Sequence, residues 1–126
     1  MRKFSEVAKE AMASSFVMAG REERKNEYML SAYPNGFTIV AAENVAITSK
    51  DGKPAIMPVY QIKEDNDIYC KGGSALAKIF GEWAALYDGD YAAMSDALKK
   101  DGGCKVKLHT TRLANGNNYT VVDVLD

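Results

Sequence analysis

Hydrophobic and polar positions follow a helical period in one long stretch of the chain, from Ser74 to Lys100. Apolar residues recur there at spacings of three and four, which predicts an amphipathic helix and, after the break at Asp88-Gly89-Asp90, a second one. The stripe of the first helix comprises Leu76, Ile79, Phe80, Trp83, Leu86 and Tyr87. The carboxylate of Asp90 can accept hydrogen bonds from the first free N–H groups of the second helix. The pair Gly102-Gly103 marks the end of that helix.

Strand-like patterns flank this helical stretch on both sides. Alternation with period two, together with β-branched and aromatic residues, predicts three strands before it and two after it. The predicted strands are 37–48, 55–63, 68–71, 104–112 and 119–125. The dipeptides Asp51-Gly52 and Asn115-Gly116 are hairpin turn signals. We expect a bend or bulge near Asn44, and Pro58 predicts an edge position or a bulge for its strand.

The N-terminal quarter of the chain has a thinner apolar pattern. A stripe of mostly alanine and methionine predicts a helix from Ser5 to Ala19. The charged run from Arg21 to Lys25 is typical of a solvated helical turn, and Asn26 can cap a short helix that ends at Ala32. We therefore expect a helical extension over residues 1–33 in front of a core over residues 37–126.

The order of these elements indicates a fold. Three strands, a helix and a final two-strand hairpin are the element order of an OB-fold barrel. A chain of 126 residues is long enough for one domain. We expect a single domain, 1–126, of the α+β class: a five-stranded OB-like β-barrel (β-β-β-α-β-β) with an N-terminal helical extension. An open α+β sheet with its helices packed on one face is the alternative.

Charge and composition exclude several classes of protein. Sixteen basic and seventeen acidic residues nearly cancel, so no global field recruits nucleic acid or membrane. No segment approaches the roughly 20 apolar residues of a membrane span. Cys70 and Cys104 are far apart, as expected of two reduced thiols, and the run 11–20 is too short and polar for a signal peptide. We expect a cytoplasmic protein without a membrane partner.

Residue patterns typical of catalysis are missing from the sequence. His109 is the only histidine, which excludes a metal site with two histidines from one chain. Cys104 lies five residues earlier on the same predicted strand, so its side chain points to the opposite face. The paired acids sit in turns, and Gly72-Gly73 lacks a following phosphate-binding motif. We predict that the protein is not an enzyme and has no cofactor, metal site or catalytic residue.

Three segments carry a resemblance to a known group of proteins. They are Ile68-Tyr69-Cys70-Lys71-Gly72-Gly73, Trp83, and the stretch from Lys105-Val106-Lys107-Leu108 through Asn115-Gly116-Asn117-Asn118-Tyr119-Thr120. Over roughly residues 37–126 the chain resembles small OB-fold single-stranded-DNA-binding proteins of the kind phages and prophages carry. The resemblance implies an OB fold and binding of single-stranded DNA.

Binding of single-stranded nucleic acid requires aromatic rings on which bases stack and cations that follow the phosphates. Tyr60 and Tyr69 are the expected stacking platforms, and the last hairpin supplies most of the cations. The candidate binding residues are Tyr60, Tyr69, Lys71, Lys105, Lys107, His109, Arg112 and Tyr119. Each has an ordinary alternative role, because tyrosines are common in half-buried strands and lysines protect exposed ones. We predict non-enzymatic binding of single-stranded DNA.

A protein-interaction module, such as a phage-encoded inhibitor or assembly factor, is the alternative function. Methionine-rich helix faces adapt to partners, and Met12 and Met18 lie on the predicted N-terminal helix. The same helix could hold a protein partner or a second copy of the chain in a homo-oligomer.

Overall fold

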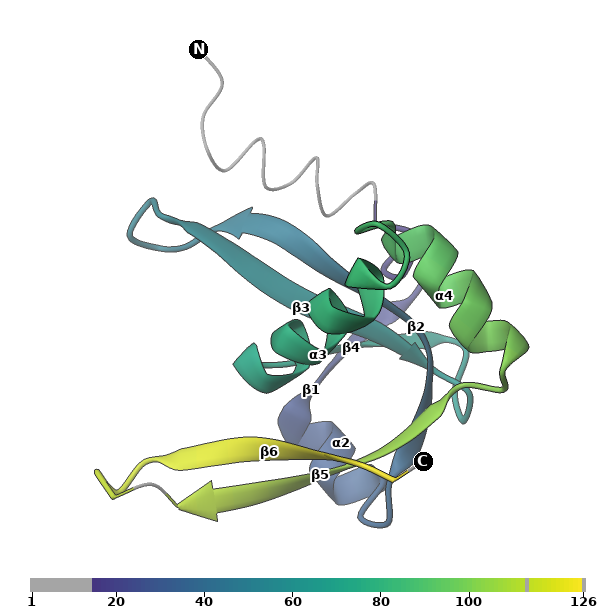
Figure 1. Cartoon of the computed structure of the whole chain (residues 1–126). Helices are drawn as coiled ribbons and strands as arrows, with labels where there is room; N and C mark the ends of the chain where they lie inside the picture. Colours follow the sequence, from purple (N-terminus) through teal and green to yellow (C-terminus); the bar gives the residue numbers. More distant parts are fainter. Residues whose placement is uncertain (1–14, 113, 126) are drawn as a thin grey trace.

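The computed structural model describes residues 15–112 and 114–125, which form one sheet and three helices (Figure 1). The strands are β1 (Glu22–Lys25), β2 (Phe37–Thr48), β3 (Pro54–Ile62), β4 (Ile68–Lys71), β5 (Cys104–Arg112) and β6 (Asn118–Val124). The helices are α2 (Asn26–Ala32), α3 (Ser74–Ala85) and α4 (Tyr91–Lys100). The two-helix block after β4 confirms the prediction, including the cap, since the Asp90 carboxylate accepts from the Ala93 amide at 3.1 Å.

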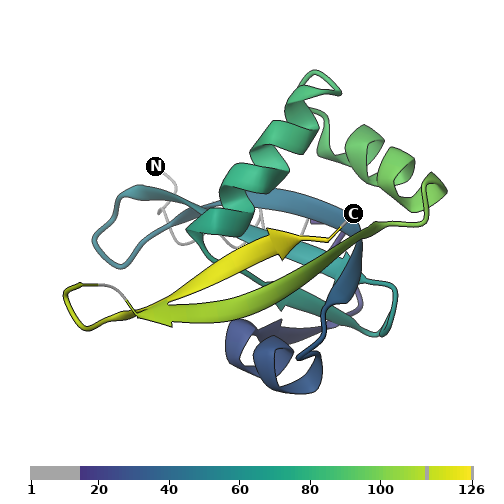
Figure 2. The same cartoon turned by 60° about the horizontal axis from the view of Figure 1, so that its bottom comes forward.

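The six strands form a single curled sheet in the order β1-β4-β3-β2-β5-β6. Only β1 and β4 run parallel, and every other neighbouring pair is antiparallel. The β2–β3 hairpin and the β5–β6 hairpin project from the same side of the molecule in both views, and α3 lies between them in the first (Figures 1 and 2). The sheet is therefore a half-barrel whose inner side holds α3.

The prediction of a five-stranded OB-like β-barrel (β-β-β-α-β-β) is wrong. The sheet has six strands, and it stays open with β1 and β6 at its two edges. Closing a barrel of the five predicted strands would require β6 to pair with β4, but β4 pairs with β1 and β3. Element order constrains local neighbours, whereas barrel closure depends on pairing between distant segments.

The predicted N-terminal helical extension over residues 1–33 is also wrong. Within the described part of that range, only α2 is helical, and the charged run that suggested a helical turn forms β1. Pairing with β4 explains the difference, because the Glu22 amide bonds to the Asp67 carbonyl at 3.1 Å and Lys71 Nζ lies 3.6 Å from Glu23 Oε1. Most of the helix predicted from Ser5 lies outside the described residues.

A line of aromatic rings runs through the core on the inner side of the sheet. Neighbouring ring centroids lie 5.6 to 6.0 Å apart along the series Tyr33, Phe37, Tyr60, Phe80 and Trp83. Phe37, Tyr60 and Phe80 are fully buried. Both the burial of these rings and the contacts between them therefore stabilise the packing of α3 on β2 and β3. The space around it is filled by buried Ile and Leu side chains, namely Ile39, Ile62, Ile68, Leu76 and Leu108.

Helix α4 packs along the edge of β2 beyond the point where β2 stops pairing with β5. β2 pairs with β5 only from Phe37 to Ile39, and the register against β3 shifts between Ile39 and Ala41. Beyond that point the Ser95 hydroxyl of α4 accepts from the Ala42 amide and donates to the Ala42 carbonyl, both at 3.0 Å. Because Ser95 is buried, these bonds satisfy a backbone unit that would otherwise lack partners.

Pro58 lies in an interior strand, contrary to the sequence prediction of an edge position or a bulge there. Its carbonyl accepts from the Gly72 amide at 2.9 Å, on the side of β4. In a strand, the backbone nitrogen and oxygen of one residue point to the same neighbouring strand, so the nitrogen of Pro58 also points toward the β4 side. Because β4 ends at Lys71, no β4 residue there needs a hydrogen bond from Pro58. The proline therefore breaks no bond to β2. The register shift of β2 lies at Ile39/Ala41 rather than near Asn44.

The outer face of the sheet carries a second, smaller apolar cluster. It is centred on strands β2, β3 and β4 and includes Val17 and Met18 from the turn that precedes β1. Its buried members are Val17, Ala41, Val45, Met57, Val59 and Tyr69. The central strands are therefore covered on both faces, which limits where a ligand can contact the sheet.

Candidate nucleic-acid interface

The predicted binding residues fall into two groups in the structure. Tyr60, Tyr69 and Lys71 lie on β3 and β4. The remaining five, which we name the cationic ribbon, lie on the β5–β6 hairpin; they are Lys105, Lys107, His109, Arg112 and Tyr119. Strands β2 and β3 separate β4 from the ribbon in the sheet, so the structure does not bring the two groups together.

Tyr60 cannot serve as a stacking platform. Its side chain is fully buried, and its ring stacks on Phe37 at a centroid distance of 5.6 Å and an interplanar angle of 8°. Both the space and the ring face that a base would need are already occupied by the core. Burial also raises the pKa of Tyr60 well above its usual value. We correct the sequence interpretation accordingly and assign Tyr60 to the core.

Tyr69 and Lys71 lie near each other but present little binding surface. Tyr60 pairs with Cys70, so Tyr69 points to the opposite, outer face of the sheet. There it belongs to the second apolar cluster, is 8% exposed, and has its pKa raised mainly by burial. Lys71 forms an ion pair with Glu23 of β1, which offsets its charge. Neither residue enters the interface that we propose below.

Lys105, Lys107 and His109 of the cationic ribbon follow the alternation expected from the sequence, whereas Arg112, at the end of β5, is out of phase with them. Val106 and Leu108 are buried in the core, so Lys105, Lys107 and His109 lie on the opposite face of β5. These three side chains are exposed or half-buried. A row of cations two residues apart along an extended strand has a spacing of about 6.6 Å, and a positively charged row of this kind can follow the backbone of a single-stranded nucleic acid.

Strand β6 contributes an aromatic ring and an acidic group to the same hairpin. Tyr119 pairs with Thr111 across the hairpin and is 39% exposed, and its hydroxyl lies 3.4 Å from that of Ser74 at the start of α3. Asp123 Oδ2 lies 3.0 Å from His109 Nδ1. The carboxylate orients the imidazole and, because Asp123 is also the cross-strand partner of Lys107, reduces the net positive charge in the middle of the ribbon.

Cys70 is the buried one of the two cysteines. Burial raises the pKa of the Cys70 thiol to about 12, so it stays protonated at neutral pH and is a poor nucleophile. Its sulfur lies 3.4 Å from that of Met29 inside the core. Within residues 15–112 and 114–125, no group of three or more His, Cys, Asp or Glu side chains is placed to hold a metal ion.

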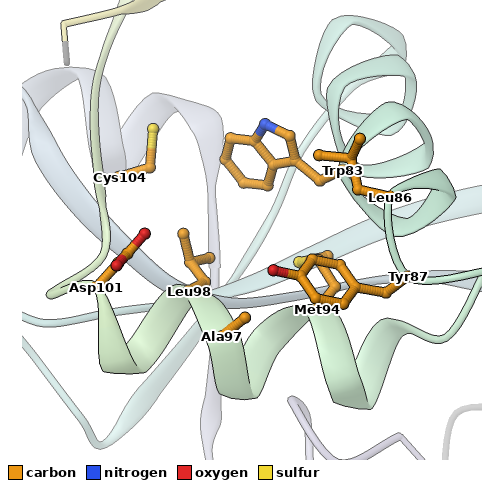
Figure 3. A pocket seen from close by; sticks show the side chains of 8 residues that line it. All are labelled: Trp83, Leu86, Tyr87, Met94, Ala97, Leu98, Asp101 and Cys104. Carbon is orange, nitrogen blue, oxygen red and sulfur yellow. The ribbon is translucent and has the colours of Figure 1, made fainter.

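A pocket that the sequence did not reveal lies between α3, α4 and the start of β5 (Figure 3). It has a volume of about 180 Å³ and is lined by Trp83, Leu86, Tyr87, Met94, Ala97, Leu98, Asp101 and Cys104. The sequence pattern assigned Leu86 and Tyr87 to the buried stripe of the first helix. However, α3 ends at Ala85, and the apolar stripe continues past that end into the turn. Such a continuation is the signal by which these two exposed residues could have been found.

Glu43 gives a testable prediction on pH. Burial on the outer face raises the pKa of this carboxyl, although the Ser15 hydroxyl donates to it at 2.8 Å. A raised pKa means that the folded state binds the proton more tightly, so stability is lost as pH rises from the unfolded pKa, about 4.3, through the folded one. Glu43→Gln should therefore melt a few degrees higher than the wild type at pH 7, and this gap should shrink toward pH 4.

The melting temperatures of the wild type and Glu43→Gln across pH 4 to 8 check this expectation. Glu82→Gln, which neutralises an exposed carboxylate on α3, is the matched control and should show no such pH-dependent gap. The gain in melting temperature of Glu43→Gln over the wild type should be larger at pH 7 than at pH 4. A gain that is smaller at pH 7 would contradict a raised pKa for Glu43.

No helix of the described part is both long and apolar enough to cross a membrane. Comparison of the chain with known protein families, with functionally characterised proteins and with solved structures yields no match. The function is therefore inferred from the residues of this chain alone.

Proposed function

We propose that the protein binds single-stranded nucleic acid, in particular single-stranded DNA, through the cationic ribbon. The observation that carries the proposal is that five of the eight residues expected from the sequence share one hairpin, at the edge of the sheet and outside the core. The proposal retains a non-enzymatic, cytoplasmic protein, and it omits Tyr60, Tyr69 and Lys71.

Two kinds of interaction, phosphate neutralisation and base stacking, support such binding. Lys105, Lys107 and Arg112 neutralise phosphates and release counterions, which contributes affinity without sequence preference. Tyr119 offers a partly exposed ring, and stacking of one base on an aromatic ring contributes about 1–3 kcal/mol. The negative charge of Asp123, which lies beside His109, weakens the positive field of the ribbon. With one ring and three permanent cations, we expect modest affinity that decreases steeply with salt.

The aromatic part of the proposal is tested by Tyr119→Ala. We expect at least a five-fold weaker Kd for a fluorescein-labelled dT oligonucleotide, because about 1 kcal/mol of stacking is the lower end of the range. The measurement is fluorescence anisotropy at low salt. Tyr28→Ala is the matched control, since Tyr28 is a similarly exposed tyrosine on α2 and outside the ribbon. Equal affinity of the two variants would remove Tyr119 from the interface.

A further inference from the structure

The pocket between α3 and α4 has the composition of a site for one apolar side chain. Trp83 and Tyr87 supply aromatic walls, and Met94 and Leu98 supply aliphatic ones (Figure 3). Its volume of about 180 Å³ is close to the roughly 150 Å³ of an apolar cavity that takes up benzene. One phenylalanine or leucine side chain therefore fills it.

Leu86 marks the rim of this pocket as a contact surface. It is 80% exposed, the largest exposure among the large hydrophobic side chains of the described residues, and its neighbour Tyr87 is 41% exposed. A single exposed leucine is ordinary on a protein surface. Here, however, it lines an apolar pocket together with an exposed tyrosine, and an apolar pocket with a few polar groups is the usual form of a binding site.

Among the residues that line the pocket, Asp101 alone is charged. Asp101 contributes a carboxylate to the pocket lining, and Asp88 and Asp90 lie in the turn that joins α3 to α4. The helical period places Lys99 and Lys100 away from the α4 face formed by Met94, Leu98 and Asp101. The Asp101 carboxylate in the lining repels phosphates, so this site does not extend the proposed nucleic-acid interface.

We propose that the pocket is a docking site for a protein partner, namely a basic amphipathic helical segment that inserts a phenylalanine or leucine between Trp83 and Leu98. Lysine or arginine residues beside that apolar residue would lie against Asp101 and the acidic turn. This inference is independent of nucleic-acid binding, because it uses neither the residues of the cationic ribbon nor the sign of their charge.

Two synthetic helical peptides provide the test. Both carry phenylalanine at the centre and leucine one helical turn away on each side; one has lysine and the other glutamate at every polar position. Trp83 is the only tryptophan, so its fluorescence reports on the pocket directly. Cys104 lines the same pocket, whereas Cys70 is buried, so the rate of maleimide labelling at Cys104 is a second readout.

We expect the lysine peptide to bind with a micromolar Kd, to shift Trp83 emission and to slow labelling of Cys104 at least ten-fold. The glutamate peptide should bind at least ten-fold more weakly. Leu86→Ser should weaken the lysine peptide at least five-fold, whereas the control Ile56→Ser, at another exposed aliphatic residue, should not. Asp101→Asn should reduce the preference for lysine over glutamate.

Three outcomes would overturn the proposal. The first is equal binding of both peptides, and the second is no change in Trp83 emission or Cys104 labelling at millimolar peptide. The third is a dimer in analytical ultracentrifugation that Leu86→Ser dissociates, which would assign the pocket to a second copy of the chain. Binding of dT oligonucleotides by the Leu86→Ser variant should equal that of the wild type, which keeps the two proposals distinguishable.

Discussion

Replacing Tyr60 with alanine is expected to reduce the free energy of unfolding by about 3–5 kcal/mol, the usual cost of truncating a large buried aromatic side chain. The ring of Tyr60 contacts Phe37 on one side and Phe80 on the other, so its loss opens a cavity at the centre of the aromatic series. Urea unfolding followed by far-ultraviolet circular dichroism measures the effect. A cost below 1 kcal/mol would contradict the placement of this ring in the core.

Tyr60→Phe separates the structural role of the ring from that of its hydroxyl. The buried hydroxyl has no hydrogen bond of good geometry among the described residues, and its neighbour Cys70 offers only a weak sulfur contact. Removing a buried polar group without a partner is neutral or stabilising, so Tyr60→Phe should keep or slightly raise the stability. Its affinity for dT oligonucleotides should be unchanged. A folded Tyr60→Phe protein that binds DNA more weakly would return Tyr60 to the interface.

Neutralising Lys105 and Lys107 together is expected to weaken binding of single-stranded DNA by an order of magnitude or more. Each lysine that contacts a phosphate adds roughly 0.7 to the slope of log K against log salt for a single strand. The double variant Lys105→Gln/Lys107→Gln should therefore lower the magnitude of that slope by about 1.4. Anisotropy titrations at four salt concentrations measure both quantities.

A second double variant controls for the change in net charge. Lys99→Gln/Lys100→Gln removes the same number of charges from exposed positions on α4, outside the ribbon. It should leave the affinity within about two-fold of the wild type, because a lysine that contacts no phosphate releases no counterion on binding. Equal losses in the two double variants would mean that total charge, and not the ribbon, determines binding.

Local patterns predicted most of the individual elements. The period-two alternation of β5 put Val106 and Leu108 on one face of the strand, and the three-and-four spacing of α3 put Leu76 and Phe80 on a stripe expected to be buried; in the structure all four side chains are buried. These predictions succeeded because each depends on residues within one element. Trp83 is only partly buried, since it packs on Phe80 with one side and lines the pocket with the other.

Features that depend on distant segments could not be predicted in this way. β1 is a four-residue charged strand whose conformation comes from pairing with β4, and nothing in Glu22–Lys25 itself favours a strand over a helical turn. The sequence interpretation put Tyr60 and Tyr69 on one binding face, whereas the pairing of Tyr60 with Cys70 puts them on opposite faces of the sheet, both of which are covered. Of the predicted binding residues, the two stacking tyrosines are therefore excluded from the candidate site, and those on the β5–β6 hairpin stay in it.

The central claim is that the cationic ribbon binds single-stranded nucleic acid, and one measurement tests it most directly. A labelled dT oligonucleotide is titrated with the wild-type protein at several salt concentrations, with duplex DNA of equal length as competitor. We predict salt-sensitive binding, with the single strand favoured over the duplex. An absence of binding to the single strand at micromolar protein and low salt would contradict the account.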